Sequence, residues 1–184
     1  GKKNICFTGM MGSGKTAIGR QFAKLIKYNF LDTDQLIEEK TGKTINEIFK
    51  DHGENYFRKF EEIIALKTLK LNNTVISLGG GAILNKSIRK LMEKNSFTIY
   101  LEVNIETLYK RLKKSKKRPL LVNKNIKKTI SEIHKKRDKY YIKALLLFPD
   151  SPTILQSLVD LKSYQGKYQE AIQYLEKIME LEPD

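Results

Sequence analysis

A glycine-rich segment near the N-terminus constrains the fold of this 184-residue chain more than any other feature. Residues 9–16 read GMMGSGKT, directly after the apolar stretch 4–8 and before apolar residues at helical spacing. Strand, glycine loop and helix in this order are the context in which Gly-x4-Gly-Lys-Thr forms a phosphate-binding loop. An apolar strand that runs into such a loop is typical of a parallel sheet. The sequence therefore predicts an α/β fold.

Short apolar segments alternate with amphipathic ones through the rest of the first 143 residues. We expect further strands at 29–32, 74–78 and 97–103, and helices that include 54–71 and the stretch from 126 towards 148. Thr44, Asn85 and Asn104 stand where helix N-caps are expected. This alternation predicts a parallel sheet covered by helices.

The glycine loop carries a specific chemistry. Its backbone N–H groups and the following helix N-terminus bind phosphate oxygens, Lys15 reaches the β and γ oxygens, and the Thr16 hydroxyl faces Mg²⁺. We therefore expect ATP and Mg²⁺ as cofactors, and Lys15 as a catalytic residue. The alternative is a glycine-rich turn with an incidental lysine. The candidate nucleotide contacts are Gly12, Ser13, Gly14, Lys15, Thr16 and Ala17.

Two acidic residues, Asp32 and Asp34, follow the second predicted strand. At the carboxyl end of a parallel sheet both side chains face the usual ligand crevice, where one can serve Mg²⁺ and the other a substrate hydroxyl. Alternatively, Thr33 or Asp34 caps a helix. A guanine-binding Asn-Lys-x-Asp motif fails at Ile126, so a GTPase is excluded.

The excess of basic residues indicates an anionic partner. The chain carries 35 Lys and Arg against 21 Asp and Glu, a net charge of +14. Ten of these cations and no acid occupy residues 110–128, which is typical of a solvated segment or an anion-binding lid. We place this lid at about 112–125.

Three observations narrow the choice of partner and compartment. Aromatic residues are not interleaved with the lid cations, which disfavours a nucleic-acid partner. The longest apolar run, 144–148, is too short to cross a membrane, so we expect no membrane partner. The single cysteine, Cys6, lies in an apolar strand and fits a buried thiol in the reducing cytoplasm.

Six motifs follow one another between residues 9 and 140. They are the glycine loop, Asp32-Thr33-Asp34, Gly53-Glu54-x-x-Phe57-Arg58-x-x-Glu61, Gly79-Gly80-Gly81, Arg118-Pro119-Leu120-Leu121 and Arg137-x-x-Tyr140. Because these motifs have the order and spacing found in shikimate kinases, the chain resembles the shikimate kinase family over about residues 2–143. The resemblance implies a three-layer P-loop fold like that of nucleoside monophosphate kinases, with a mobile lid. It also implies ATP-dependent phosphorylation of the 3-hydroxyl of shikimate, in aromatic amino-acid biosynthesis.

The resemblance implies roles for residues around the phosphates. Asp34 would bind the accepting hydroxyl and act as its base, and Asp32 would stand beside Thr16 around Mg²⁺. Arg118 would reach the transferring phosphoryl group, and Arg111 would stack on adenine.

The resemblance also implies a binding site for the carboxylate of shikimate. Arg58 and Arg137 would hold this group, and the backbone of Gly79, Gly80 and Gly81 would line the same pocket. Planar guanidinium groups match a carboxylate through two parallel hydrogen bonds, which explains arginine rather than lysine at both positions. Taken alone, each arginine could equally be a solvated charge on a helix face.

The C-terminal segment differs from the rest of the chain. Three lysines and seven acids give residues 144–184 a net charge of −4, against +18 for residues 1–143. Four residues recur with the 34-residue period of tetratricopeptide repeats: Ala144, Leu147, Pro149 and Asp150 correspond to Ile178, Leu181, Pro183 and Asp184. We expect a kinase domain at 1–143 followed by an α-helical repeat-like hairpin at 144–184. An ordinary two-helix hairpin is the alternative.

This tail replaces the last strand, adenine-contacting turn and final helix with which shikimate kinases usually end. A single repeat cannot bury its apolar faces alone, so it would pack on the kinase domain or on another chain. We therefore expect a monomer or a tail-mediated homo-oligomer. The charge break near residue 144 also favours a fusion of two segments. The alternative function is a kinase-derived scaffold with impaired catalysis whose tail mediates protein interaction.

Overall fold

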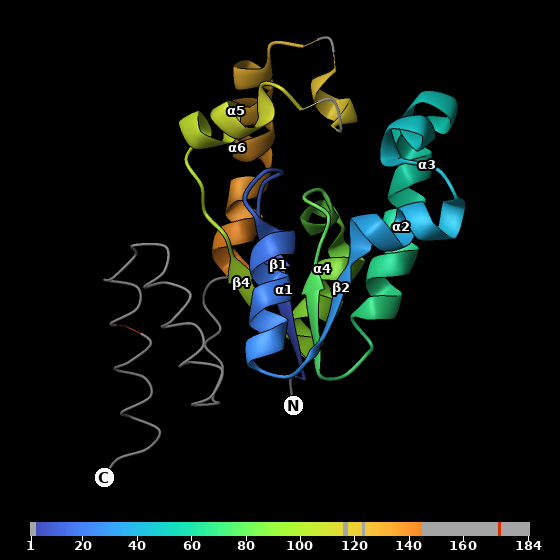
Figure 1. The fold of residues 1–184 in the computed structure, drawn as a ribbon, viewed down its shortest axis with the longest axis vertical. Coiled ribbons are helices and arrows are strands. Elements are labelled where there is room, and N and C mark those ends of the chain that lie inside the picture. Colours follow the sequence, from blue (N-terminus) through green and yellow to red (C-terminus); the bar gives the residue numbers. More distant parts are fainter. Residues whose placement is uncertain (1–2, 116–117, 123, 145–172, 174–184) are drawn as a thin grey trace.

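A four-stranded parallel sheet forms the centre of the computed structural model, which describes residues 3–115, 118–122, 124–144 and 173 (Figure 1). Within these residues the strands are β1 (Asn4–Thr8), β2 (Asn29–Asp32), β3 (Thr74–Ser77) and β4 (Ser96–Tyr100). Their order is β2-β3-β1-β4, and each neighbouring pair is parallel. The predicted α/β fold with a parallel sheet is confirmed, although β4 ends three residues earlier than expected.

Helices separate the strands. In the described part of the chain they are α1 (Lys15–Leu25), α2 (Thr33–Thr41), α3 (Ile45–Thr68), α4 (Lys86–Asn95), α5 (Ile105–Leu112) and α6 (Ile126–Ala144), with 3-10 turns η1 (Ala82–Leu84) and η2 (Pro119–Leu121). The predicted N-caps Thr44, Asn85 and Asn104 each accept backbone hydrogen bonds, and Thr44 forms a capping box with Glu47. Gly53, with φ of 80°, kinks α3 where the sequence predicts a break.

Alternate strand residues pack against different helices because successive side chains point to opposite faces of a sheet. On β1, Ile5 and Phe7 pack with Phe22 of α1, whereas Cys6 belongs to the core that includes Ile88 of α4. Cys6 is completely buried, as predicted. Figure 1 shows α1 in front of the sheet and α4 and α6 behind it, which gives three layers.

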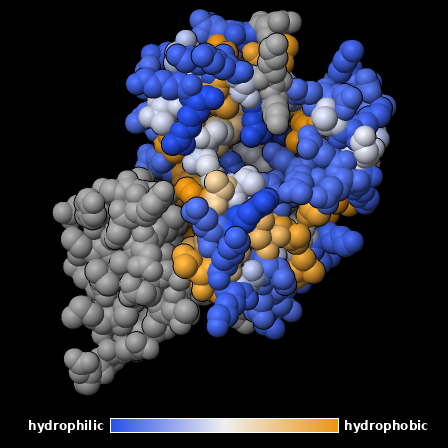
Figure 2. Space-filling model, viewed as in Figure 1, coloured by the Kyte–Doolittle hydropathy of each residue, from blue (hydrophilic) through white to orange (hydrophobic). Residues whose placement is uncertain are grey.

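The carboxyl ends of three strands meet at one edge of the sheet. There β1 runs into the glycine loop, β2 into Asp32, and β3 into Gly79–Gly81. In Figure 1, α2 and α3 stand on one side above this edge, and α5 and the start of α6 stand on the other. Figure 2 shows that hydrophilic residues predominate on the surface on both sides. The fold therefore places its ligand crevice at the edge that the sequence predicts.

The C-terminal hairpin predicted at 144–184 lies outside the described residues, apart from Ala144 and Gln173. Among the helices that the structure describes, none is long and apolar enough to cross a membrane.

Candidate active site

A cavity of about 670 Å³, including the part open to solvent, lies over the glycine loop. Of the six predicted contacts in the glycine loop, five line it: Gly12, Gly14, Lys15, Thr16 and Ala17. Gly12 and Gly14 have φ of 78° and 95°, a region that residues with a Cβ rarely adopt. Ser13 is buried beside them, and its hydroxyl has no hydrogen-bond partner in the part of the chain that the structure describes. A loop of this kind can bind phosphate oxygens, which would accept hydrogen bonds from the Ser13 hydroxyl and from the backbone N–H groups.

Lys15 is buried under this loop. Its Nζ donates to the carbonyl oxygens of Gly9, at 2.9 Å, and Met10, at 3.0 Å. Burial lowers the pKa of Lys15 to about 8, and the nearby Asp34 carboxylate opposes that change. The ammonium group is thus held by backbone carbonyls at the floor of the cavity.

Thr16 and Asp32 form the predicted Mg²⁺ position. The Thr16 hydroxyl donates to Asp32 Oδ2 at 2.6 Å. Oxygen atoms of this kind suit Mg²⁺, which also takes ligands from nucleotide phosphates and water. No group of three or more His, Cys, Asp or Glu that could hold a metal occurs among the described residues, so an ion here would depend on the phosphates.

Asp32 is also the N-cap of α2. Its Oδ1 accepts the backbone N–H groups of Asp34, at 2.9 Å, and Gln35, at 3.3 Å. The alternative that Thr33 or Asp34 caps this helix is therefore wrong, because both residues lie in its first turn. The cap fixes Asp32 and leaves the Asp34 side chain available to the crevice.

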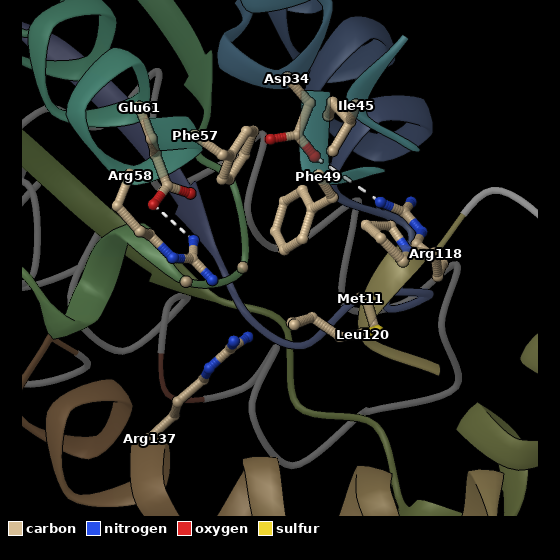
Figure 3. A pocket seen from close by; sticks show the side chains of 13 residues that line it. Met11, Asp34, Ile45, Phe49, Phe57, Arg58, Glu61, Arg118, Leu120 and Arg137 are labelled. Atoms are coloured by element: carbon tan, nitrogen blue, oxygen red, sulfur yellow. Dashed lines mark hydrogen bonds and ion pairs between the residues drawn. The ribbon is translucent and has the colours of Figure 1, made fainter. Parts of the chain in front are cut away.

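A second cavity, of about 450 Å³ including its open part, lies beside the first. It is lined by cationic, acidic and apolar side chains, among them Arg58, Arg137, Glu61, Phe49, Phe57 and Leu120 (Figure 3). Four residues line both cavities: Met11, Asp34, Gly80 and Arg118. The two cavities therefore meet at the Asp34 carboxylate.

Asp34 stands at this junction with 30% of its side chain exposed. Burial and the charge of Asp32 raise the pKa of the Asp34 carboxyl, in spite of the cations Arg118, Lys15 and Arg58. Arg118 Nη1 lies 3.6 Å from Asp34 Oδ2. A carboxylate with a raised pKa is a better proton acceptor than an ordinary aspartate.

Arg58 is fixed by two carboxylates. Its Nη1 donates to Glu61 Oε2 at 2.6 Å, and its Nη2 donates to Glu54 Oε1 at 2.8 Å. Glu61 is buried, and burial raises the pKa of its carboxyl although Arg58 opposes the change. This contact allows Glu61 to orient the Arg58 guanidinium.

Arg137 has a different environment. Only 3% of the residue is exposed, and its Nη1 has no hydrogen-bond partner within the described residues. Figure 3 shows the guanidinium groups of Arg58 and Arg137 directed into the same space. Because a buried, incompletely paired guanidinium is costly, this end of the cavity suits an anion.

The three predicted glycines leave room for these side chains. A Cβ on Gly79 would lie 2.6 Å from both Asp34 Oδ1 and Glu61 Oε1, and a Cβ on Gly81 would overlap the Arg58 guanidinium. Gly80 packs against Arg137, since a Cβ there would lie 3.1 Å from Arg137 Nη1. Gly80 and Gly81 line the second cavity as predicted, whereas Gly79 is not among its lining residues.

Arg111 lies beside the glycine loop, where its Nη1 donates to the Gly12 carbonyl oxygen at 2.9 Å. Its stacking on adenine stays a prediction. Sequence reasoning missed Phe49, which lines the second cavity, and assigned no role to Glu54, which binds Arg58. The i, i+4 spacing of Glu54 and Arg58 was a usable signal for that ion pair.

The family of the chain follows from comparison with known proteins. A model of the family described as Shikimate kinase matches residues 11–158. The chain belongs to the shikimate kinase family. As a member of the shikimate kinase family it is a kinase, a phosphotransferase.

Individual shikimate kinases agree with this assignment. That of Caldanaerobacter subterraneus subsp. tengcongensis is 42% identical over 139 residues, which cover 76% of this chain and 81% of that protein. That of Clostridium botulinum strain 657 is 48% identical over 145 residues, covering 77% and 84%. The structure of shikimate kinase from Acinetobacter baumannii in complex with shikimate matches with a TM-score of 0.78 and 31% identity, covering 90% of this chain and 94% of that one.

Proposed function

We propose that the chain transfers the γ-phosphoryl group of ATP to the 3-hydroxyl of shikimate, giving ADP and shikimate 3-phosphate. The observation that carries the proposal is the meeting of the phosphate-loop cavity and the arginine-lined cavity at Asp34. Membership in the shikimate kinase family supports the same reaction, as does the likeness to a structure that contains shikimate.

The second cavity matches the chemistry of shikimate, a cyclohexene ring that bears one carboxylate and three hydroxyl groups. In the proposed complex Arg58 and Arg137 bind the carboxylate, and the ring lies against Phe49 and Phe57. A hydroxyl then faces Asp34 beside the glycine loop. The charges run in the required direction, with cations at one end of the cavity and a carboxylate at the other.

The proposed transfer requires positioning more than covalent chemistry. Asp34 accepts the proton of the shikimate hydroxyl as its oxygen bonds to the γ-phosphorus, and the bond from that phosphorus to the β–γ bridging oxygen breaks. Lys15 and Arg118 stabilise the charge on the transferring group. Thr16 and Asp32 are the residues that would hold Mg²⁺, which neutralises phosphate charge when bound.

We propose further features that follow from the sequence. The kinase domain spans residues 1–143 with a lid at about 112–125, and residues 144–184 form a tetratricopeptide-like appendage. The protein is cytoplasmic and takes no nucleic-acid or membrane partner. It is a monomer or a tail-mediated homo-oligomer, which light scattering on the full chain distinguishes.

A coupled assay of ADP release tests the proposed reaction. The full chain is given ATP and Mg²⁺ with shikimate, with gluconate, or with no acceptor. We expect ADP release that depends on shikimate and stays at the background rate with gluconate. Equal rates in all three mixtures would refute the proposal.

A further inference from the structure

Tyr141 is a completely buried tyrosine that links α6 to two loops of the active site. Its hydroxyl donates to the Gly80 carbonyl oxygen at 2.9 Å, and its oxygen lies 3.9 Å from the sulfur of Met10. Its ring stacks on Tyr100, the last residue of β4, with centroids 4.7 Å apart. One side chain therefore contacts the chain after β1, after β3 and at the end of β4.

Packing alone does not explain the hydroxyl of Tyr141. A phenylalanine would fill the same space, whereas a buried hydroxyl is costly unless it makes a hydrogen bond. The group that satisfies it is the carbonyl of a glycine that lines both cavities. The hydrogen bond thus restrains a loop that the substrate contacts in the proposed complex.

The restrained carbonyl determines the direction of a neighbouring donor. The described part of the chain contains no cis peptide bond, so the Gly80–Gly81 peptide is trans and planar. In such a peptide the C=O and the following N–H point in opposite directions. A Gly80 carbonyl held towards Tyr141 therefore directs the Gly81 N–H away from the Tyr141 hydroxyl.

Arg137 contacts the same loop from the same helix. It lies one turn before Tyr141 on α6, and its Nη1 packs against Gly80. Burial raises the pKa of Tyr141, and the positive charge of the nearby Arg137 guanidinium opposes that rise. The hydroxyl of Tyr141 and the guanidinium of Arg137 thus both contact Gly80.

We propose that the Tyr141 hydroxyl is a positioning group for the carboxylate end of the substrate pocket. Through Gly80 it fixes the Gly81 N–H and the Arg137 guanidinium relative to one another, so that both meet the carboxylate without rearrangement. This inference rests on the proposed function, because it assigns the carboxylate to that end of the pocket. Tyr141 touches no reacting atom and acts only through Gly80 and Arg137.

The variant Tyr141→Phe removes one oxygen atom and keeps the ring. We expect the KM for shikimate to rise about 3- to 10-fold, with kcat and the KM for ATP within about twofold of the unchanged chain. Calorimetric titration with shikimate alone should show the same loss of affinity in the folded variant. A matched control is Tyr140→Phe, because the described contacts of Tyr140 with Arg89 and Lys139 use its ring.

A second substrate separates positioning from general loosening of the fold. Shikimate methyl ester keeps the ring and hydroxyl groups and lacks the negative charge. We expect Tyr141→Phe to lower kcat/KM for shikimate about 3- to 10-fold and to leave kcat/KM for the ester nearly unchanged. Equal losses for both substrates, or an unchanged KM for shikimate, would overturn the inference. Absence of shikimate turnover by the unchanged chain would instead refute the proposed function.

Discussion

The two cavities of the active site are built in different ways. The first cavity, over the glycine loop, takes half of its lining residues from one short stretch, residues 11–17. The second cavity, which we propose binds the shikimate carboxylate and call the carboxylate pocket, takes its charged side chains from α2, α3, the segment before α6, and α6 itself. Asp34 lines both.

Because the two cavities are built from different elements, substitutions in one should affect different kinetic constants from substitutions in the other. Loss of a group from the nucleotide cavity removes charge stabilisation during transfer, which lowers kcat. Loss of a guanidinium from the carboxylate pocket weakens an interaction made before transfer, which raises the KM for shikimate. Asp34 is the residue at which this separation should break down.

Asp34→Asn should have the largest effect on turnover. Loss of the proton acceptor should lower kcat by roughly 10²- to 10⁴-fold. The same change should raise the midpoint of thermal unfolding at pH 7. The folded state raises the pKa of Asp34, so the ionised form opposes folding above the ordinary aspartate pKa, and asparagine carries no such charge.

Steady-state kinetics tests the expected loss of kcat in Asp34→Asn, and thermal unfolding tests the expected rise in its unfolding midpoint. A kcat within tenfold of the unchanged chain would exclude Asp34 as the base. A lower unfolding midpoint would contradict the direction of its pKa shift.

Lys15→Ala should lower kcat by about 10²-fold or more, because it removes a preorganised cation from the transferring group. The affinity for shikimate, measured by calorimetry without ATP, should stay within about twofold. Lys24→Ala is the matched control, since Lys24 is an exposed lysine in the last turn of the same helix. A parallel loss of shikimate affinity in Lys15→Ala would show that the cavities are not separable.

Arg58→Ala and Arg137→Ala should each raise the KM for shikimate roughly 10- to 100-fold, as expected for hydrogen bonds to a charged group. Their effects on stability should differ. Arg58→Ala leaves the buried Glu61 without the partner that lies 2.6 Å away, so it should lower the unfolding midpoint. Arg137→Ala removes a guanidinium whose Nη1 has no partner within the described residues, so the midpoint of thermal unfolding should stay the same or rise. Equal destabilisation of both variants would contradict this contrast.

The smallest effect that we expect is the change of kcat/KM for ATP with pH. Because the pKa of Lys15 is lowered to about 8, the ammonium loses its proton as the pH rises through that value. We expect kcat/KM for ATP to fall above pH 8, by at most about tenfold per pH unit, while the affinity for shikimate stays constant. The guanidinium groups of Arg58 and Arg137 keep their protons over this range. A flat ATP profile from pH 7 to 9.5 would contradict the shift.

The sequence predicts a ligand site over the glycine loop, and the structure has a cavity there, because the loop is built from consecutive residues. A glycine loop between a strand and a helix has one geometry, and its ligands lie within a few residues of Lys15. The N-caps Thr44, Asn85 and Asn104 are predicted correctly for the same reason. Asp32 is harder to place, because either Thr33 or Asp34 satisfies the same cap preference.

The carboxylate pocket is less accessible from the sequence because its geometry depends on long-range contacts. The hydrogen bond from Tyr141 to Gly80 joins residues 61 positions apart. The motif quoted from the sequence contains Tyr140, whereas the structure uses the next residue for this contact. Helical spacing alone does not decide which of two adjacent tyrosines faces the loop. The apolar wall at Phe49 likewise depends on how α3 packs.

We propose that the two cavities form one site in which a phosphoryl group passes from ATP to a shikimate hydroxyl. Phosphorus-31 NMR of the full chain with ATP, Mg²⁺ and shikimate tests it directly, because it separates a phosphate ester from inorganic phosphate. We predict one new phosphate ester, at the 3-position of shikimate, for each ADP formed. Formation of ADP with inorganic phosphate and no phosphate ester would contradict phosphoryl transfer to shikimate.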